Sequence, residues 1–158
     1  MSVELKRSIS TIAALLGAAI FAASCGPDDA KPEQALAIVA SDPALKWGPC
    51  PELFPAGCEI AVLHGDPSKA NADVFLRVPS HYEIPAHWHS SAERMVLVAG
   101  ELQLTYKGQP ASTLVAGNYA YGPAKLAHKA SCLSAGACTL FIAFEAPVDA
   151  HTFEGSFE

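Results

Sequence analysis

The sequence predicts an all-β domain, built as a sandwich or a barrel. From residue 47 onward, apolar residues alternate with polar ones or form short runs. Glycine and proline interrupt these runs at short intervals. No ten-residue stretch of this region has the 3.6-residue apolar period of an amphipathic helix. Many short strands at nearly regular spacing are typical of β sandwiches and barrels.

Eight segments are expected to form strands. The first, 59–63, is mostly apolar and ends at the turn residues His64-Gly-Asp-Pro67. Two later strands are separated at Ala99-Gly100, where glycine breaks the apolar pattern. The last strand is apolar along most of its length, as a buried strand is. In chain order the expected strands are 59–63, 74–78, 83–89, 94–98, 101–106, 113–115, 119–121 and 139–144.

The composition suits one folded domain. The chain has 158 residues, of which 51% are hydrophobic, so it can bury a substantial core. Such a hydrophobic sequence is not expected to be disordered as a whole. The formal net charge is −6, whereas nucleic-acid binding requires a basic face. We therefore expect a small-molecule ligand or substrate and no nucleic acid.

The first 24 residues have the pattern of a secretory signal peptide. Lys6 and Arg7 form a short basic segment, and the following stretch, 9–23, is apolar and rich in small residues. This stretch is too short and too weakly flanked to predict a membrane-spanning helix. A buried N-terminal helix is the alternative, but small residues followed by Cys25-Gly-Pro favour a processing site.

A lipid anchor is also expected at this end of the chain. Phe21-Ala-Ala-Ser-Cys25 resembles the lipobox of bacterial lipoproteins, although Ala22 stands where that motif usually has leucine. The resemblance implies lipidation of Cys25, with ordinary signal cleavage as the alternative. Residues 25–45 are polar and contain prolines, which predicts a tether with a turn or two of helix at 34–40. The protein would then be exported, in the periplasm or cell envelope, and contact the membrane only through the anchor.

Four cysteines follow the predicted signal as two closely spaced pairs, Cys50 with Cys58 and Cys132 with Cys138. An exported protein meets an oxidising compartment, which favours disulfides. Pairing within each close pair is the simplest of the three possible connectivities. A zinc site made of thiolates is the weaker alternative, since neither pair has the short gap of a zinc knuckle.

Four further residues predict a metal site. His87 and His89 stand two apart, so on a strand they project from the same face. Glu93 follows after Ser-Ser-Ala, and His128 lies further along the chain. Three imidazoles and a carboxylate suit one divalent Fe, Mn, Ni, Cu or Zn ion, and donor identity alone does not choose among these metals. Surface histidines on an amphipathic strand are the alternative.

The spacing of these residues resembles the two motifs of the cupin superfamily. The first motif is His87-x-His89, three residues, Glu93, six residues, Gly100; the second is Gly117, five residues, Pro123 and then His128. The ordered pair spans roughly residues 55–145. This resemblance implies a double-stranded β-helix, the cupin jelly roll, with the metal inside. We expect a cupin domain at 46–150 and a C-terminal tail at 151–158.

Three positions depart from the cupin motifs. His81 and Lys125 stand where the motifs have glycine, and Cys132 stands where the second motif has asparagine. These positions concern turns and strand ends rather than ligands. The leader Leu63-His-Gly-Asp-Pro67 is similar to that of a group of small single-domain cupins, some of which resemble the cupin half of ChrR-type anti-sigma factors.

The resemblance implies two kinds of function. One is a metal-dependent enzyme, either a dioxygenase-like oxidoreductase, a decarboxylase or an isomerase of a small organic substrate. No clear general base accompanies the ligands, and the catalytic residues stay unassigned; the candidates are Tyr106, Tyr119, Tyr121 and Glu83. The other is a non-catalytic sensor or scavenger lipoprotein, and a structural cupin with vestigial histidines is a third reading. Cupins often pair through their sheets, so a homodimer is a further implication.

Overall fold

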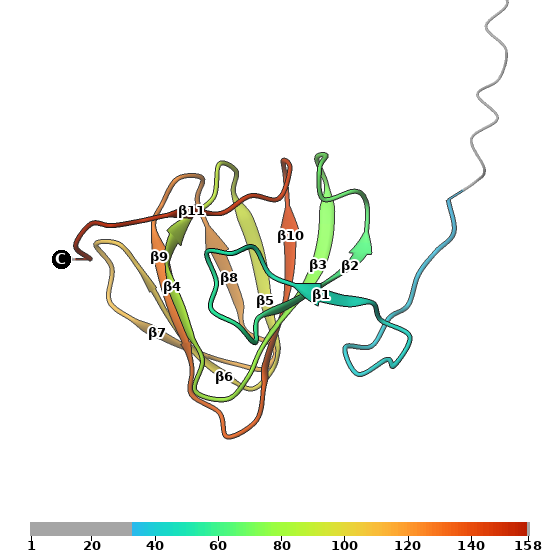
Figure 1. Cartoon of the computed structure of the whole chain (residues 1–158), viewed down its shortest axis with the longest axis horizontal. Helices are drawn as coiled ribbons and strands as arrows, with labels where there is room; N and C mark the ends of the chain where they lie inside the picture. Colours follow the sequence, from blue (N-terminus) through green and yellow to red (C-terminus); the bar gives the residue numbers. More distant parts are fainter. Residues whose placement is uncertain (1–32, 158) are drawn as a thin grey trace, which may run out of the picture. The chain divides into compact units, whose positions relative to one another are not determined.

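The computed structural model describes residues 33–157, and Figure 1 shows two β-sheets facing each other. The first sheet has the order β1 (Trp47–Pro49), β2 (Glu59–His64), β3 (Ala72–Val78), β10 (Cys138–Phe144), β5 (Glu93–Ala99) and β8 (Tyr119–Gly122). The second has the order β11 (His151–Thr152), β4 (Glu83–Trp88), β9 (His128–Cys132), β6 (Glu101–Tyr106) and β7 (Ser112–Val115). All of these neighbouring strands run antiparallel. The predicted all-β class is therefore confirmed, whereas the predicted signal peptide and Cys25 lie outside the described residues.

The eight predicted strands are present, with bounds that differ by a few residues, as β2 to β8 and β10. His89 is the main exception, because β4 ends at Trp88 and His89 begins the turn that follows. The sequence pattern missed β1, β9 and β11. Strand β9 was missed because its inward residues are His128, Ala130 and Cys132, which do not form a recognisable apolar alternation.

The helix expected at 34–40 is wrong. No helix forms among the described residues of this segment, and the chain makes turns instead. The Asp42 N–H donates to the Val39 carbonyl, and the Asp42 side chain accepts from the Ala44 N–H at 2.8 Å. Leu36 and Val39 are 61% and 64% exposed, so no apolar helix face is available to pack. Among the described residues, none forms a helix of the length and hydrophobicity that crossing a bilayer would require.

The core lies between the two sheets and consists mainly of aliphatic side chains. Its most deeply buried members include Val74, Val78, Leu97, Leu102 and Leu140. Inward residues alternate with outward ones along β5 and β6, as expected for strands with one buried face. This apolar packing fixes the two sheets against each other and thereby positions the strands that carry the site.

Both expected disulfides form. Cys132–Cys138 joins β9 of one sheet to β10 of the other, so it ties the two sheets together. Cys50–Cys58 closes the loop between β1 and β2. Each closes a loop of fewer than ten residues and should contribute about 2–3 kcal/mol to stability in the chain-entropy account.

Two turns, one before β4 and one before β9, have residues in the left-handed conformation. His81 has φ 57° and Lys125 has φ 64°, and these are the two positions where the motifs have glycine. A residue with a Cβ atom is disfavoured there by about 1–2 kcal/mol. The Lys125 N–H nevertheless donates to the His89 carbonyl at 2.8 Å. The turn geometry is therefore kept without glycine, at a cost in stability.

Candidate metal centre

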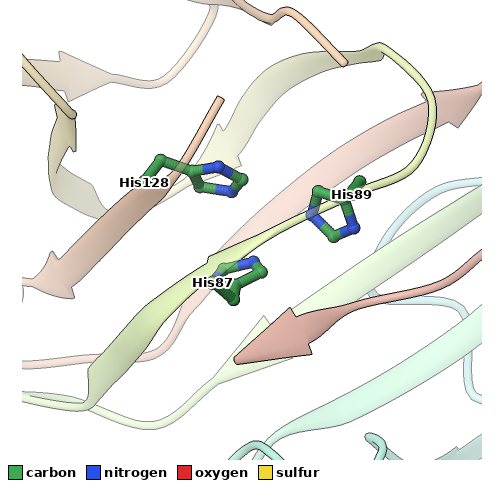
Figure 2. A group of neighbouring side chains, drawn as sticks. All are labelled: His87, His89 and His128. Carbon is green, nitrogen blue, oxygen red and sulfur yellow. The ribbon is translucent and has the colours of Figure 1, made fainter. Parts of the chain in front are cut away.

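Three buried imidazoles meet on the inner side of the second sheet (Figure 2). His87 lies on β4, His89 directly follows it, and His128 begins β9. One ligand atom from each of these histidines lies within 4.8 Å of the others. Their exposed fractions are 4%, 7% and 4%, so all three point inward as the sequence predicted. The alternative of surface histidines is thereby excluded.

A bulge in β4 turns His87 inward. Ile84 pairs with Ala130 and His87 pairs with His128. Between these two pairs β4 advances by three residues, whereas β9 advances by two. In a regular ladder Ala86, not His87, would face His128. The extra residue falls at Pro85-Ala86, and proline suits an irregular position because it has no N–H to donate. The bulge thus shifts the alternation by one residue, so that His87 and His89, rather than Ala86 and Trp88, face inward.

The outer nitrogen of each imidazole contacts a main-chain carbonyl. His87 Nδ1 lies 2.7 Å from the Pro85 oxygen, and His128 Nδ1 lies 3.3 Å from the Leu126 oxygen. His89 Nδ1 contacts the Asp149 oxygen. A carbonyl oxygen only accepts, so each Nδ1 carries the hydrogen and each Nε2 keeps its lone pair. This is the arrangement by which proteins orient histidine ligands toward a metal.

Glu93 completes the group from the opposite sheet. It begins β5, its exposed fraction is 2%, and its two oxygens face two imidazoles. Oε2 lies 3.4 Å from His89 Nε2, and Oε1 lies 3.0 Å from His128 Nε2. Oε1 has no hydrogen bond, although it is fully buried. Donors to one metal at about 2.0–2.2 Å lie roughly 3 Å apart when they are adjacent in its coordination sphere, which matches this spacing.

Gly122 makes room for Glu93, and sequence reasoning missed it. The two residues pair across β5 and β8. A Cβ atom at position 122 would lie 2.8 Å from Glu93 Oε1 and 2.9 Å from its Cγ, well inside contact distance. Only glycine therefore leaves the carboxyl group in its observed position. The sequence offers no signal for this role beyond the glycine itself.

Burial sets the charge state of the four groups. Burial, with a contribution from neighbouring histidines, lowers the pKa of His87 to about 4 and that of His128 to about 3. Burial also lowers the pKa of His89 and raises that of Glu93 to about 8. At pH 7 all four are therefore neutral without a metal. Three imidazole lone pairs and a carboxyl group with an unpartnered oxygen fit a divalent transition metal, which would stabilise the ionised form of Glu93.

A cavity of about 60 Å³ adjoins the three histidines. Most of its lining is apolar and comes from both sheets. Phe54 packs edge-on against His87, with ring centres 5.1 Å apart, and Phe144 packs against His89 at 5.4 Å. Met95 lines the cavity, whereas Leu97, which shares the inward face of β5, is buried in the core. Phe144 and Phe54 line the cavity as well, and the sequence pattern predicted neither role.

The four candidate acid–base residues differ in their exposure and in whether they contact the triad. Tyr119 and Tyr121 are 58% and 47% exposed, and Glu83 faces solvent, where it accepts from Ser131. Tyr106 alone among the four contacts a histidine of the triad, with ring centres 5.5 Å apart from His128. Its buried hydroxyl has no hydrogen-bond partner, and burial raises its pKa. Arg94 faces outward and pairs with Glu145.

The C-terminal segment after β10 contributes to the site. Strand β11 pairs with β4, so that His151 lies opposite Trp88 and stacks on its ring at 4.2 Å. This pairing places Asp149 beside His89, whose Nδ1 contacts its carbonyl. The Asp149 carboxylate accepts from the Ser90 N–H at 2.9 Å. Sequence reasoning missed Asp149, because a partner 60 residues away leaves no local pattern.

The ChrR cupin-like domain family matches residues 36–147 of the chain. No curated protein matches the sequence. Among solved structures, an RmlC-like cupin from Shewanella frigidimarina NCIMB 400 is 19% identical with a TM-score of 0.55, over 66% of this chain and 86% of the other. The DMSP lyase DddQ from Ruegeria pomeroyi DSS-3 is 18% identical with a TM-score of 0.60, over 71% and 64%. An oxalate oxidase is 14% identical with a TM-score of 0.54, over 63% and 56%.

These likenesses concern the fold. They confirm the jelly roll that the two motifs predicted. The chain spans less than two thirds of the length of the lyase and of the oxidase. Identities below 20% carry no assignment of substrate or reaction from these proteins to this one.

Proposed function

Because this chain belongs to the ChrR cupin-like domain family, we propose that it is a metal-binding cupin of the bacterial cell envelope. One divalent Fe, Mn, Ni, Cu or Zn ion would be held by His87, His89, Glu93 and His128. The observation that carries the proposal is the convergence of three imidazoles whose Nδ1 atoms all contact carbonyls. Their Nε2 atoms are thereby free for one ion, and Glu93 supplies the negative charge.

The first form of this function is an enzyme acting on a small organic substrate, as an oxygenase, decarboxylase or isomerase. A metal bound by four protein groups would supply Lewis acidity and open coordination positions. The chain itself supplies an apolar cavity that excludes water from the bound molecule. Two neighbours of the same fold are named for acting on small molecules, DMSP and oxalate. Tyr106 contacts His128 but does not line the cavity.

The second form is a sensor or scavenger that binds a metal or a small ligand without turnover. The shortage of acid–base groups favours it. Besides the four proposed ligands, Asp149 is the one ionisable residue on the cavity wall among residues 33–157. Its carboxylate already accepts from Ser90 and contacts His151. A binding role requires the pocket and no general base.

The cell-envelope assignment is supported by the N-terminal pattern and by the cysteines. Residues 1–24 resemble a signal peptide, with Cys25 as the lipidation site. Two disulfides suit an oxidising compartment. We propose that residues 25–45 tether the domain to the membrane surface and that the partner is a small molecule, with a homodimer as the assembly to test.

Elemental analysis of the purified protein tests the proposal. About one transition-metal ion per chain is expected in the wild type, with loss of that ion in His128→Ala. His64→Ala is the matched control, because His64 is an exposed histidine on β2, outside the triad. A wild type that takes up no metal, or a His128→Ala variant that retains it, would contradict the proposal. Incubation with small organic acids under air then separates turnover from binding alone.

A further inference from the structure

The cavity beside the triad is apolar on nearly every side that the proposed ligands do not occupy. Both sheets contribute aliphatic side chains to its wall, among them Ile60, Val74, Leu76, Leu102, Leu104 and Ile142. No lysine or arginine of residues 33–157 lines it. A molecule in this cavity therefore meets polar groups at one end only, where the histidines converge.

Apart from the four proposed metal ligands, the ionisable side chain on the cavity wall, that of Asp149, already has partners. The Nδ1 atoms of the three histidines contact carbonyls. The Asp149 carboxylate accepts from the Ser90 N–H and lies 3.1 Å from His151 Nε2. A second polar group on a bound molecule would thus lose its water without gaining a hydrogen bond. Such a loss lowers affinity roughly 5- to 150-fold per group.

Phe54 forms part of the wall on the loop that Cys50–Cys58 closes. The loop is held at three points: the disulfide, the Cys50 N–H to the Cys58 carbonyl at 3.2 Å, and the Tyr82 hydroxyl to the Pro55 carbonyl. The ring of Phe54 is therefore fixed against His87 rather than free in solvent. It adds apolar surface next to the position where a metal-bound molecule would extend.

From this geometry we propose that the cavity selects a small, mainly apolar molecule with a single oxygen-bearing head group. The inference rests on the proposed function, because the head group would bind the metal while the apolar part fills the cavity. One water needs about 10–15 Å³ of such space, so a cavity of about 60 Å³ has room for a chain of a few carbons. Dicarboxylates, amino acids and sugars are excluded by the unpartnered polar groups that they would bury.

Straight-chain acids test the proposal on the metal-loaded full mature chain. Isothermal titration calorimetry gives Kd for acetate, butanoate, hexanoate and succinate, and elemental analysis gives the metal content of the same samples. Each buried methylene should tighten binding about fourfold, so butanoate should bind roughly tenfold or more tightly than acetate. Succinate differs from butanoate by a second carboxylate and should bind at least about fivefold more weakly.

Substitutions in the loop that Cys50–Cys58 closes test whether Phe54 causes the preference for longer acids. Phe54→Ala should reduce the preference for hexanoate over acetate, whereas Leu53→Ala should not, since Leu53 is also half-buried but does not line the cavity. Phe54→Arg places a cation on the wall and should reverse the preference between butanoate and succinate. This reversal requires a folded protein, so a melting curve accompanies each variant.

Two outcomes overturn the inference while leaving metal binding intact: a metal-loaded protein in which affinity does not rise with chain length, or one in which succinate binds as tightly as butanoate. Removal of the metal should weaken binding of all four acids but preserve the ratio between hexanoate and acetate, which depends on the cavity alone. If the purified protein takes up no metal when metal is supplied, the proposed function fails, and the inference fails with it only if the ratio between hexanoate and acetate is lost as well.

Discussion

Substituting Gly122 by alanine should weaken metal binding without unfolding the domain. The added Cβ would lie 2.8 Å from Glu93 Oε1 and 2.9 Å from Cγ, whereas ordinary contacts between heavy atoms are about 3.5–4 Å. The Glu93 carboxyl group must therefore move by roughly 0.5–1 Å. Metal–ligand distances tolerate only about 0.2 Å, so Glu93 could not keep its position in the coordination sphere.

The expected effect is about a 10- to 100-fold loss of metal affinity, as is usual when a residue that supports a metal ligand is changed. The loss corresponds to about 1.4–2.7 kcal/mol of binding free energy. Competition with a chromophoric chelator measures the dissociation constant directly. Circular dichroism melting checks that the variant is folded.

Gly48→Ala is the matched control. Gly48 also lies in a strand, and a Cβ atom at this position would meet nothing within 4 Å. Its metal affinity should equal that of the wild type. If Gly122→Ala binds metal as tightly as Gly48→Ala, Glu93 does not ligate the metal from the position in which we find it.

Three further predictions concern proton release, the pH dependence of stability and a turn. Metal binding at pH 6.5 should release about one proton. The reason is that burial raises the pKa of Glu93 to about 8, whereas the metal binds the ionised form of Glu93. Calorimetry in buffers of different ionisation enthalpy measures the number of protons released. Because this pKa is raised above the unfolded value, the metal-free protein should lose stability from pH 7 to 8. Below pH 7 the three histidines, whose pKa values burial lowers, change stability in the opposite direction. Lys125→Gly should stabilise the fold by about 0.5–1 kcal/mol in urea unfolding, because φ is 64° there. Lys129→Gly, in β9, should instead destabilise it by about as much.

Local periodicity predicted much of the site. His87 and His89 share a face because strand residues alternate, and Glu93 starts an apolar strand whose inward residues point to the same space. The alternation holds at His87 only because of the bulge at Pro85-Ala86. The position of a bulge cannot be predicted from the spacing of apolar residues in the sequence. The position of His87 was therefore predicted from its spacing to His89 and not from the start of its strand.

The remaining parts of the site depend on contacts between distant segments. Gly122 matters because β8 pairs with β5, and Phe54 reaches His87 because a disulfide closes its loop. Neither contact has a local sequence pattern. Strand β9 was missed for a related reason: its buried positions include a histidine of the candidate metal centre and a disulfide cysteine instead of aliphatic residues. His128 and Cys132 therefore occupy positions at which apolar side chains would have identified the strand.

The three histidines differ in how their orientation is secured. His87 and His128 each contact a carbonyl two residues earlier in the chain, so their own strands and turns orient them. His89 depends on Asp149, which lies beyond the 36–147 region that matches the family. It is held there by β11 and by the Ser90 N–H. The orientation of His89 in the candidate metal centre therefore depends on the C-terminal segment, and His89 is the proposed ligand that loss of this segment should affect most.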